Sequence, residues 1–184
     1  MIKKELPEWK SVHTIIFDFD GIFTNNLVFV DTNGLESVCC NRSDGLGFDI
    51  LRAFISINLW DLDYFILSKE KNSVVKKRAD KMGLKCYHGI SRKIDFIKSY
   101  IYEKKFNNGS EGLIYLGNDL NDLSAMDFAG YSVSPIDGHS LIKKKADLVI
   151  NKKGGEGFVR EFIEKIIRID SLTEKELCNL TELL

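Results

Sequence analysis

The chain has 184 residues and a formal net charge of -1, with 44% hydrophobic and 29% charged residues. These values predict one soluble globular domain, spanning residues 1–184, that is large enough to bury a hydrophobic core. The balanced charge contains no basic block, which argues against nucleic acid or an anionic membrane surface as a partner.

No stretch of the sequence is apolar for long enough to span a membrane, and the N-terminus has no signal-peptide pattern. The four cysteines lie at positions 39, 40, 86 and 178, without the spacing of a metal-binding site. We therefore expect reduced cysteines in a cytoplasmic protein.

The first predicted strand is the apolar run over residues 12–17, and a hairpin follows it. Two apolar runs, 27–30 and 35–39, flank a turn that ends in Asn33-Gly34, and Asn-Gly between apolar runs predicts a β-hairpin. A small apolar ribbon in water is only marginally stable. We therefore expect the hairpin to pack against another subunit.

Downstream of the hairpin, predicted helices and strands alternate. A loop over residues 41–47 leads into the first helix, which Asp44 is expected to cap. The last predicted helices are the amphipathic segment 158–169 and a terminal helix within 171–184, opened by the capping-box spacing of Ser171 and Glu174. Between these ends, strands are expected at 62–67, 84–87, 112–116, 131–133 and 147–150. Helices are expected at 73–82, 93–104 and 140–144, and the segment 117–122 is expected to open a further helix that ends at residue 129.

This alternation predicts an α/β fold with a Rossmann-like, mostly parallel sheet and helices on both faces. Its core would span about residues 12–168, with the hairpin protruding after the first strand and no second domain. A basic, glycine-rich loop over residues 152–157 is expected to be mobile.

Polar residues follow the ends of successive predicted strands, and in an open parallel sheet these ends gather where ligands bind. Paired carboxylates can share a divalent cation such as Mg²⁺, or one can attack an electrophile while the other handles protons. A Ser hydroxyl and a Lys ammonium suit phosphate oxygens. Taken alone, each residue could equally be a helix cap or a solvated charge. The residues are Asp18, Asp20, Ser68, Lys93, Asp119 and Asp122.

Four segments resemble, in order, the motifs of the haloacid dehalogenase superfamily of phosphatases. Residues 18–24, DFDGIFT, are similar to its first motif, DxDGxxT. Ser68 and Lys93 fall at the positions of its second and third motifs, and residues 117–122, GNDLND, resemble its acidic fourth motif. Order and spacing together make this resemblance specific, whereas any one motif alone would be weak.

The chain most resembles a branch of that superfamily that has no cap domain. The branch includes 3-deoxy-D-manno-octulosonate 8-phosphate phosphatases, 9-phosphate phosphatases of nonulosonic (sialic-acid-like) sugars and the phosphatase-like domain of acylneuraminate cytidylyltransferases. The resemblance rests on the apolar hairpin and on segments 43–47, 68–75 and 154–161. It implies a homotetramer in which the hairpins associate and a neighbouring subunit helps to close the site.

The resemblance also implies a role for each motif residue. Asp18 would be the nucleophile and an Mg²⁺ ligand. Asp20 would be the general acid and base, with its backbone carbonyl on the metal. Asp119 would be the third protein ligand of the metal. Ser68 and Lys93 would hold the phosphoryl group.

Four further residues complete the predicted site. Asp122 would orient Lys93 or a water on the metal. Many members of the branch have Asp where this chain has Asn118, so either Asn118 or its neighbour could reach the cation. We favour Asp119, because an ionised carboxylate is the better ligand for Mg²⁺. Thr24 and Asn25 are candidate substrate contacts, with turn formation as the alternative.

The expected function is that of a Mg²⁺-dependent phosphatase acting on a nonulosonate 9-phosphate or an octulosonate 8-phosphate through an aspartyl-phosphate. A phosphatase for another small phosphorylated metabolite is one alternative. A receiver domain, which also combines an acidic cluster with Ser or Thr and Lys, is a second, but its phosphoacceptor lies on a later strand. A third is a non-catalytic oligomerisation module of a cytidylyltransferase system, against which the intact acids argue.

Overall fold

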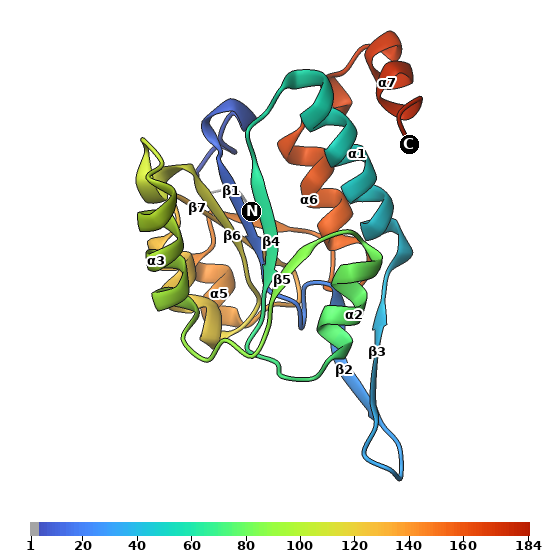
Figure 1. The fold of residues 1–184 in the computed structure, drawn as a ribbon, viewed down its shortest axis with the longest axis vertical. Helices are drawn as coiled ribbons and strands as arrows, with labels where there is room; N and C mark the ends of the chain where they lie inside the picture. The colour runs from blue at the N-terminus through green and yellow to red at the C-terminus, as the bar shows by residue number, and fades with distance from the viewer. Residues whose placement is uncertain (1–3) are drawn as a thin grey trace.

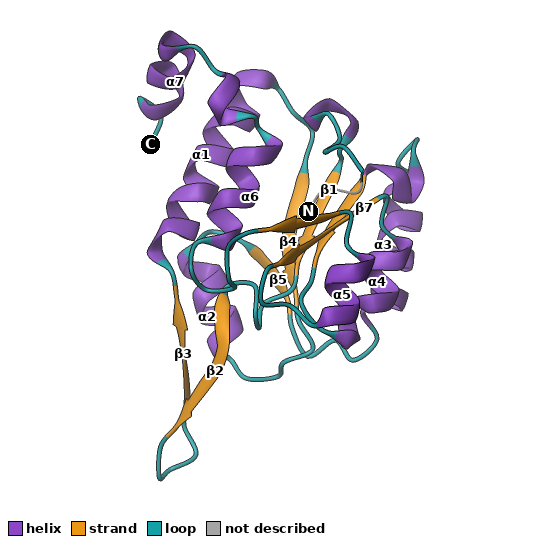
Figure 2. Ribbon diagram, turned by 180° about the vertical axis from the view of Figure 1, so that it is seen from behind, coloured by secondary structure: helices purple, strands orange, loops and turns teal. Residues whose placement is uncertain are grey.

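The computed structural model describes residues 4–184, and its centre is a six-stranded sheet (Figures 1 and 2). Every neighbouring pair of strands is parallel, in the order β5-β4-β1-β6-β7-β8. Strands of a parallel sheet are covered on both faces, and all residues of β1 are accordingly buried. The strands are β1 (Thr14–Phe17), β4 (Asp63–Leu67), β5 (Lys85–Tyr87), β6 (Leu113–Leu116), β7 (Tyr131–Pro135) and β8 (Leu148–Ile150).

Helices cover both faces of this sheet (Figures 1 and 2). Ile15 and Phe17 belong to the core beneath α1, α2 and α6, and Ile16 belongs to the opposite core beneath α3, α4 and α5. The predicted α/β fold with helices on both faces is thus confirmed. None of the described helices has the length and apolar character that a membrane span requires. The helices are α1 (Arg42–Asn58), α2 (Val74–Lys81), α3 (Lys93–Lys104), α4 (Leu123–Phe128), α5 (Ser140–Lys145), α6 (Phe158–Ile166) and α7 (Glu174–Thr181), with 3-10 turns η1 (Trp9–Ser11), η2 (Gly109–Gly112), η3 (Leu120–Asp122) and η4 (Ile169–Ser171).

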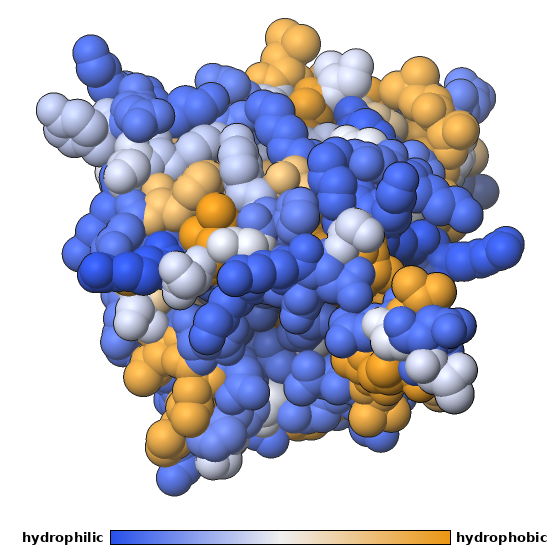
Figure 3. Space-filling model, turned by 60° about the horizontal axis from the view of Figure 1, so that its bottom comes forward, coloured by the Kyte–Doolittle hydropathy of each residue, from blue (hydrophilic) through white to orange (hydrophobic). Residues whose placement is uncertain are grey.

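The hairpin of β2 (Thr24–Val30) and β3 (Glu36–Cys40) extends beyond the sheet, at the bottom of Figure 1. Five of its apolar side chains are between 51% and 69% exposed. Figure 3 turns this end of the molecule forward and shows apolar patches on a largely hydrophilic face. Exposed apolar surfaces of this kind are typical of protein interaction sites. The exposed residues are Leu27, Val28, Phe29, Val30 and Leu35.

The first helix begins earlier than the sequence predicts. The expected loop over residues 41–47 is helical from Arg42, and Asn41, not Asp44, caps the helix by accepting the N–H of Ser43. Glycines disfavour helix in isolation, but tertiary packing overrides this preference. A Cβ on Gly47 would lie 3.2 Å from the Cα of Arg160 in α6. The glycine thus lets the two helices approach closely.

The terminal helix begins later than predicted. Thr173 and Glu176 form the capping box, rather than Ser171 and Glu174. Ser171 belongs instead to the preceding 3-10 turn, η4. Two capping-box spacings overlap in this segment, and packing of that turn selects the second.

Candidate active site

A cavity of about 390 Å³ lies at the carboxyl ends of β1, β4 and β6. These strands are neighbours in the sheet, so the segments that follow them meet at one edge. Five of the nine predicted site residues line the cavity, together with five others. The lining consists of Asp18, Asp20, Asn26, Ser68, Lys69, Glu70, Lys71, Asn118, Asp119 and Asn121.

A buried ion-pair network lies beneath this cavity. The Nζ of Lys93, at the first position of α3, is 2.7 Å from Oδ1 of Asp18 and 2.7 Å from Oδ1 of Asp122. Tyr115 donates its hydroxyl to the same Asp122 oxygen at 2.8 Å. The backbone N–H of Asn118 donates to Oδ2 of Asp122 at 3.0 Å. Asp122 therefore holds Lys93, and Lys93 holds one oxygen of Asp18.

Burial is the main influence on the pKa values of Asp18 and Asp20. It raises the pKa of Asp18 to about 7, with a further rise from the Asp122 carboxylate and an opposing effect from Lys93. Burial also raises the pKa of Asp20, and the nearby Glu70 carboxylate adds to the shift. Burial alone would lower the pKa of Lys93, but the two aspartates outweigh it and raise that pKa. Lys93 is thus a fixed cation, while Asp20 has the raised pKa of a proton donor.

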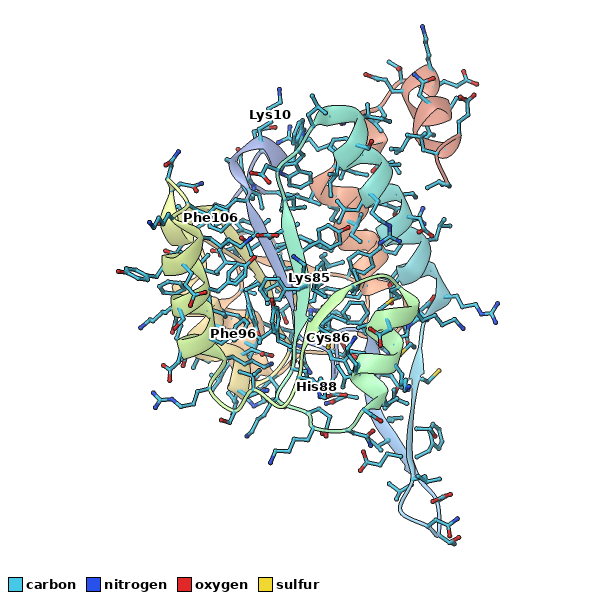
Figure 4. The ribbon with its side chains drawn as sticks, viewed as in Figure 1. Lys10, Lys85, Cys86, His88, Phe96 and Phe106 are labelled. Atoms are coloured by element: carbon cyan, nitrogen blue, oxygen red, sulfur yellow. The ribbon has the colours of Figure 1, made fainter. Side chains whose placement is uncertain are left out.

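Ser68 follows β4 and is buried at the cavity wall, where its Oγ accepts the N–H of Glu70 at 3.0 Å. Its hydroxyl proton remains available to an anion in the cavity. His88 follows the neighbouring β5 at the same end of the sheet (Figure 4), but it does not line the cavity.

Thr24 and Asn25 do not line the cavity. Thr24 is fully buried, and its Oγ1 accepts the backbone N–H groups of Gly21 and Asn26, both at 3.1 Å. The side chain of Asn25 accepts the N–H of Leu27 at 3.2 Å in a local turn. The structure places Asn26 at the cavity instead, a residue that sequence reasoning did not select.

The glycine-rich loop over residues 152–157 packs against the turn of the first motif. The N–H of Gly155 donates to the carbonyl of Ile22 at 3.1 Å. A Cβ on Gly154 would lie 1.9 Å from the carbonyl oxygen of Gly21, so only glycine fits there. The expectation of a mobile loop does not fit these contacts, because the loop forms a wall behind the turn that carries Asp18 and Asp20.

Comparisons with known proteins extend the resemblance of the motifs. A scan against protein-family models found no match. The 3-deoxy-D-manno-octulosonate 8-phosphate phosphatase KdsC of Yersinia pestis is 30% identical over 158 residues, which are 85% of this chain and 80% of that protein. A crystal structure from Streptomyces avermitilis, assigned to the HAD (haloacid dehalogenase) family of hydrolases, is 34% identical, with a TM-score of 0.82 over 94% of this chain and 95% of that one.

The chain belongs to the HAD family of hydrolases. The family and the enzyme class predicted from the motifs, a phosphoric monoester hydrolase, are therefore confirmed. The 3-deoxy-D-manno-octulosonate 8-phosphate phosphatase of Moraxella catarrhalis, solved with a magnesium ion, a phosphate ion and KDO, is 25% identical. Its TM-score is 0.76 over 87% of this chain and 88% of that one.

A divalent cation is implied for this HAD hydrolase, and the cavity can accommodate one. Among residues 4–184, no group of three or more His, Cys, Asp or Glu side chains could hold a metal ion, so other oxygens are needed. Oδ1 of Asn118 is buried at the cavity without a hydrogen-bond partner. The absence of a side chain on Gly21 makes room for this amide, since a Cβ there would lie 2.0 Å from its Nδ2. Carboxylate, amide and carbonyl oxygens are suitable Mg²⁺ ligands.

Sequence reasoning missed Tyr115, which lies in the fully buried β6 and supports Asp122. Its position two residues before Gly117 is the available signal, because a hydroxyl in a buried strand needs a partner. Which partner it finds depends on strand register and on the fold of the next turn, and neither is readable from the local sequence.

Asp44, which packs against α6, gives this HAD hydrolase a testable pH dependence. Burial raises its pKa to about 6, and one carboxylate oxygen has no hydrogen-bond partner. In the unfolded chain the pKa of this carboxyl is about 3.9, so the unfolded state loses the proton before the folded state does. The free energy of unfolding therefore falls as the pH rises from 4 to 6. We expect Asp44→Asn to raise the free energy of unfolding at pH 7 by up to about 3 kcal/mol, and the gain to vanish near pH 4.

Urea unfolding at pH 4, 5, 6 and 7 measures this effect. Asp49→Asn, on the same helix but at the surface and paired with Arg52, is the matched control. A gain that is the same at every pH, or a loss of stability at pH 7, would contradict the prediction.

Proposed function

We propose that this hydrolase releases inorganic phosphate from a phosphate monoester of a 2-keto-3-deoxy sugar acid, either a nonulosonate 9-phosphate or an octulosonate 8-phosphate. The observation that carries the proposal is Lys93, held between Asp18 and Asp122 under a cavity at the carboxyl edge of the sheet. The KdsC relatives and the Moraxella catarrhalis complex with phosphate and KDO support the substrate class. The proposed phosphatase domain spans the whole chain.

The proposed reaction has two steps. A carboxylate oxygen of Asp18 attacks phosphorus in line with the sugar oxygen, the phosphorus–oxygen bond to the sugar breaks, and Asp20 gives its proton to the leaving oxygen. Asp20 then takes a proton from water, which attacks the aspartyl-phosphate and releases phosphate with Asp18 regenerated. Lys93 and the Ser68 hydroxyl hold the phosphoryl oxygens.

Mg²⁺, when bound, would neutralise charge between the Asp18 carboxylate and the phosphate. We propose that Asp18, the backbone carbonyl of Asp20 and Oδ1 of Asn118 hold it. The sequence favoured Asp119 over Asn118, but the exposed carboxylate of Asp119 already accepts the N–H of Leu120 at 2.7 Å. We therefore propose Oδ1 of Asn118, which has no hydrogen-bond partner, as the metal ligand in place of Asp119.

This ligand set makes a prediction that needs no turnover. Asn118→Ala is expected to weaken Mg²⁺ binding about tenfold or more, which is the size of the loss in metal affinity when a residue that supports a metal site is mutated. Asp119→Ala should have the smaller effect. Titration calorimetry of the substrate-free protein with MgCl₂ measures both. A larger loss in Asp119→Ala would restore the assignment made from the sequence.

The exposed hairpin supports a proposed homotetramer. Its apolar side chains would be covered by equivalent hairpins, and the neighbouring subunit would complete the rim of the site. Light scattering of the wild type should report a tetramer, and the Phe29→Asp variant a smaller species, because a buried charge without a partner opposes association. A wild-type monomer would overturn this proposal and leave the chemistry untouched.

Phosphate release from a panel of esters tests the function. The panel contains octulosonate 8-phosphate, N-acetylneuraminate 9-phosphate, its deaminated analogue, hexose phosphates and 4-nitrophenyl phosphate, each with Mg²⁺ or EDTA. Mg²⁺-dependent release favouring one keto-acid sugar supports the proposal. Release from hexose phosphates alone would keep the chemistry and overturn the substrate class, while no release from any ester would favour a non-catalytic oligomerisation module.

A further inference from the structure

The base of the hairpin contains an irregularity that faces the active site. Thr24 pairs with Cys40 and Val28 pairs with Val38, so three residues of β2 stand against a single residue of β3. Bulges of this kind are frequent next to active sites, where they re-aim a side chain. Here the extra residues include Asn26, which alone among the residues of β2 and β3 lines the cavity.

The backbone of Asn26 is left-handed, with φ of 62°. Three other non-glycine residues among 4–184 share this conformation, and each ends a helix. Leu59 and Lys105 are the C-caps of α1 and α3, and Arg168 directly follows the C-cap of α6. Helix termination explains those three but not Asn26. Strain of this kind clusters at functional sites, where the surrounding structure enforces it.

Three contacts enforce the position of Asn26. Its own N–H is held by Oγ1 of Thr24, which also accepts the N–H of Gly21. The glycine-rich loop packs behind that turn through Gly155. On the β3 side, the carboxylate of Glu36 accepts the side-chain amide of Asn72 at 2.8 Å, which ties the hairpin to the segment after Ser68.

We infer that Asn26 is a specificity-determining residue that binds the leaving group of the substrate. The inference rests on the proposed function and adds to it a residue from the hairpin. The phosphoryl group is held at the bottom of the cavity by Ser68 and Lys93, so the leaving group extends toward the rim. There the amide of Asn26 offers two donors and one acceptor, which suit the hydroxyls and carboxylate of a sugar acid.

Glycine is the discriminating substitution at this position. Asn26→Gly keeps the left-handed backbone, relieves its strain and removes only the side-chain amide. Most substitutions at a bulge confound strain with lost contacts, whereas this one separates them. Asn26→Asp keeps the shape but puts a negative charge beside the anionic substrate, so its effect should exceed that of glycine.

The experiment compares two substrates in each variant. One is the ester that the wild type prefers, and the other is 4-nitrophenyl phosphate, whose leaving group has no hydroxyl chain or carboxylate. In Asn26→Gly, kcat/KM for the preferred ester should fall about tenfold more than kcat/KM for 4-nitrophenyl phosphate, which corresponds to the loss of one hydrogen bond. The fall should appear mainly in KM.

An equal fall in kcat/KM on both substrates would assign Asn26 a structural role and overturn the inference. An unchanged kcat/KM for the preferred ester would also overturn it. Asn25→Ala, which removes the neighbouring amide, should change the selectivity less than Asn26→Gly does. A larger change in Asn25→Ala would identify Asn25 as the substrate contact. If the wild type prefers a hexose phosphate, the proposed substrate class fails while Asn26 is still tested on that ester. A wild type without any turnover overturns both.

Discussion

Asp18→Asn is expected to reduce Mg²⁺-dependent phosphate release by at least about 1,000-fold, the scale of loss when a nucleophile is removed. The amide has the size of the carboxylate but cannot attack phosphorus. Lys93 keeps its second partner, Asp122, at 2.7 Å, so the buried cation stays paired and the fold should persist. The measurement is single-turnover phosphate release, with circular dichroism to show that the variant is folded.

Asp61→Asn is a matched control, because Asp61 is an exposed carboxylate just before β4, at the opposite end of the sheet. It should match the wild type in rate. Retention of more than a few per cent of activity by Asp18→Asn would contradict the assigned nucleophile. Trapping of radioactive phosphate on the wild type, and not on the variant, would give independent support.

Lys93→Met is expected to lower both stability and activity. Its ammonium separates two buried carboxylates, and removing one partner of a buried pair costs about 3–5 kcal/mol. In the proposed mechanism Lys93 holds the phosphoryl group, so its loss should lower kcat/KM by about 100-fold or more. Urea unfolding and phosphate release measure the two effects.

The stability loss should depend on pH with a definite sign. Without Lys93, burial and the Asp122 carboxylate keep the pKa of Asp18 above its usual range, with no opposing cation. The charged form is then unfavourable in the folded state, so the deficit of Lys93→Met should shrink as the pH falls toward 4 and the carboxyls become protonated.

Lys98→Met tests the same substitution on the exposed face of the same helix and should cost little. If Lys93→Met does not fold, the double variant with Asp122→Asn should recover stability, because it removes one of the two facing charges. A Lys93→Met protein with wild-type stability and rate would contradict the role of the network.

The sequence predicted the sheet well because its strands are apolar runs buried on both faces. Their order in a parallel sheet then places Asp18, Ser68 and Asn118 at one edge, and the structure brings all three to one cavity. The order of the haloacid dehalogenase motifs along the chain groups the same three residues independently. This part of the site could be predicted because it depends on where strands end, which is a local property of the chain.

What the sequence could not predict depends on contacts between distant segments. The close packing of α1 against α6 depends on Gly47 beside Arg160, and the support of Asp122 depends on the register of Tyr115. The choice between Asn25 and Asn26 depends on the irregular pairing of β2 with β3 between Thr24 and Val28. In each case the partner residue lies on another segment and cannot be identified from the residues next to the position concerned.

The packing of Gly154 against Gly21 has a consequence for the order in which the domain folds. The turn after β1 packs against a loop that follows β8, so the two segments are separated by all the other strands of the sheet. Contacts between such distant segments form late, because the intervening chain must be ordered first. The turn that carries Asp18 and Asp20 is therefore expected to become fixed only after the sheet between these two segments has formed.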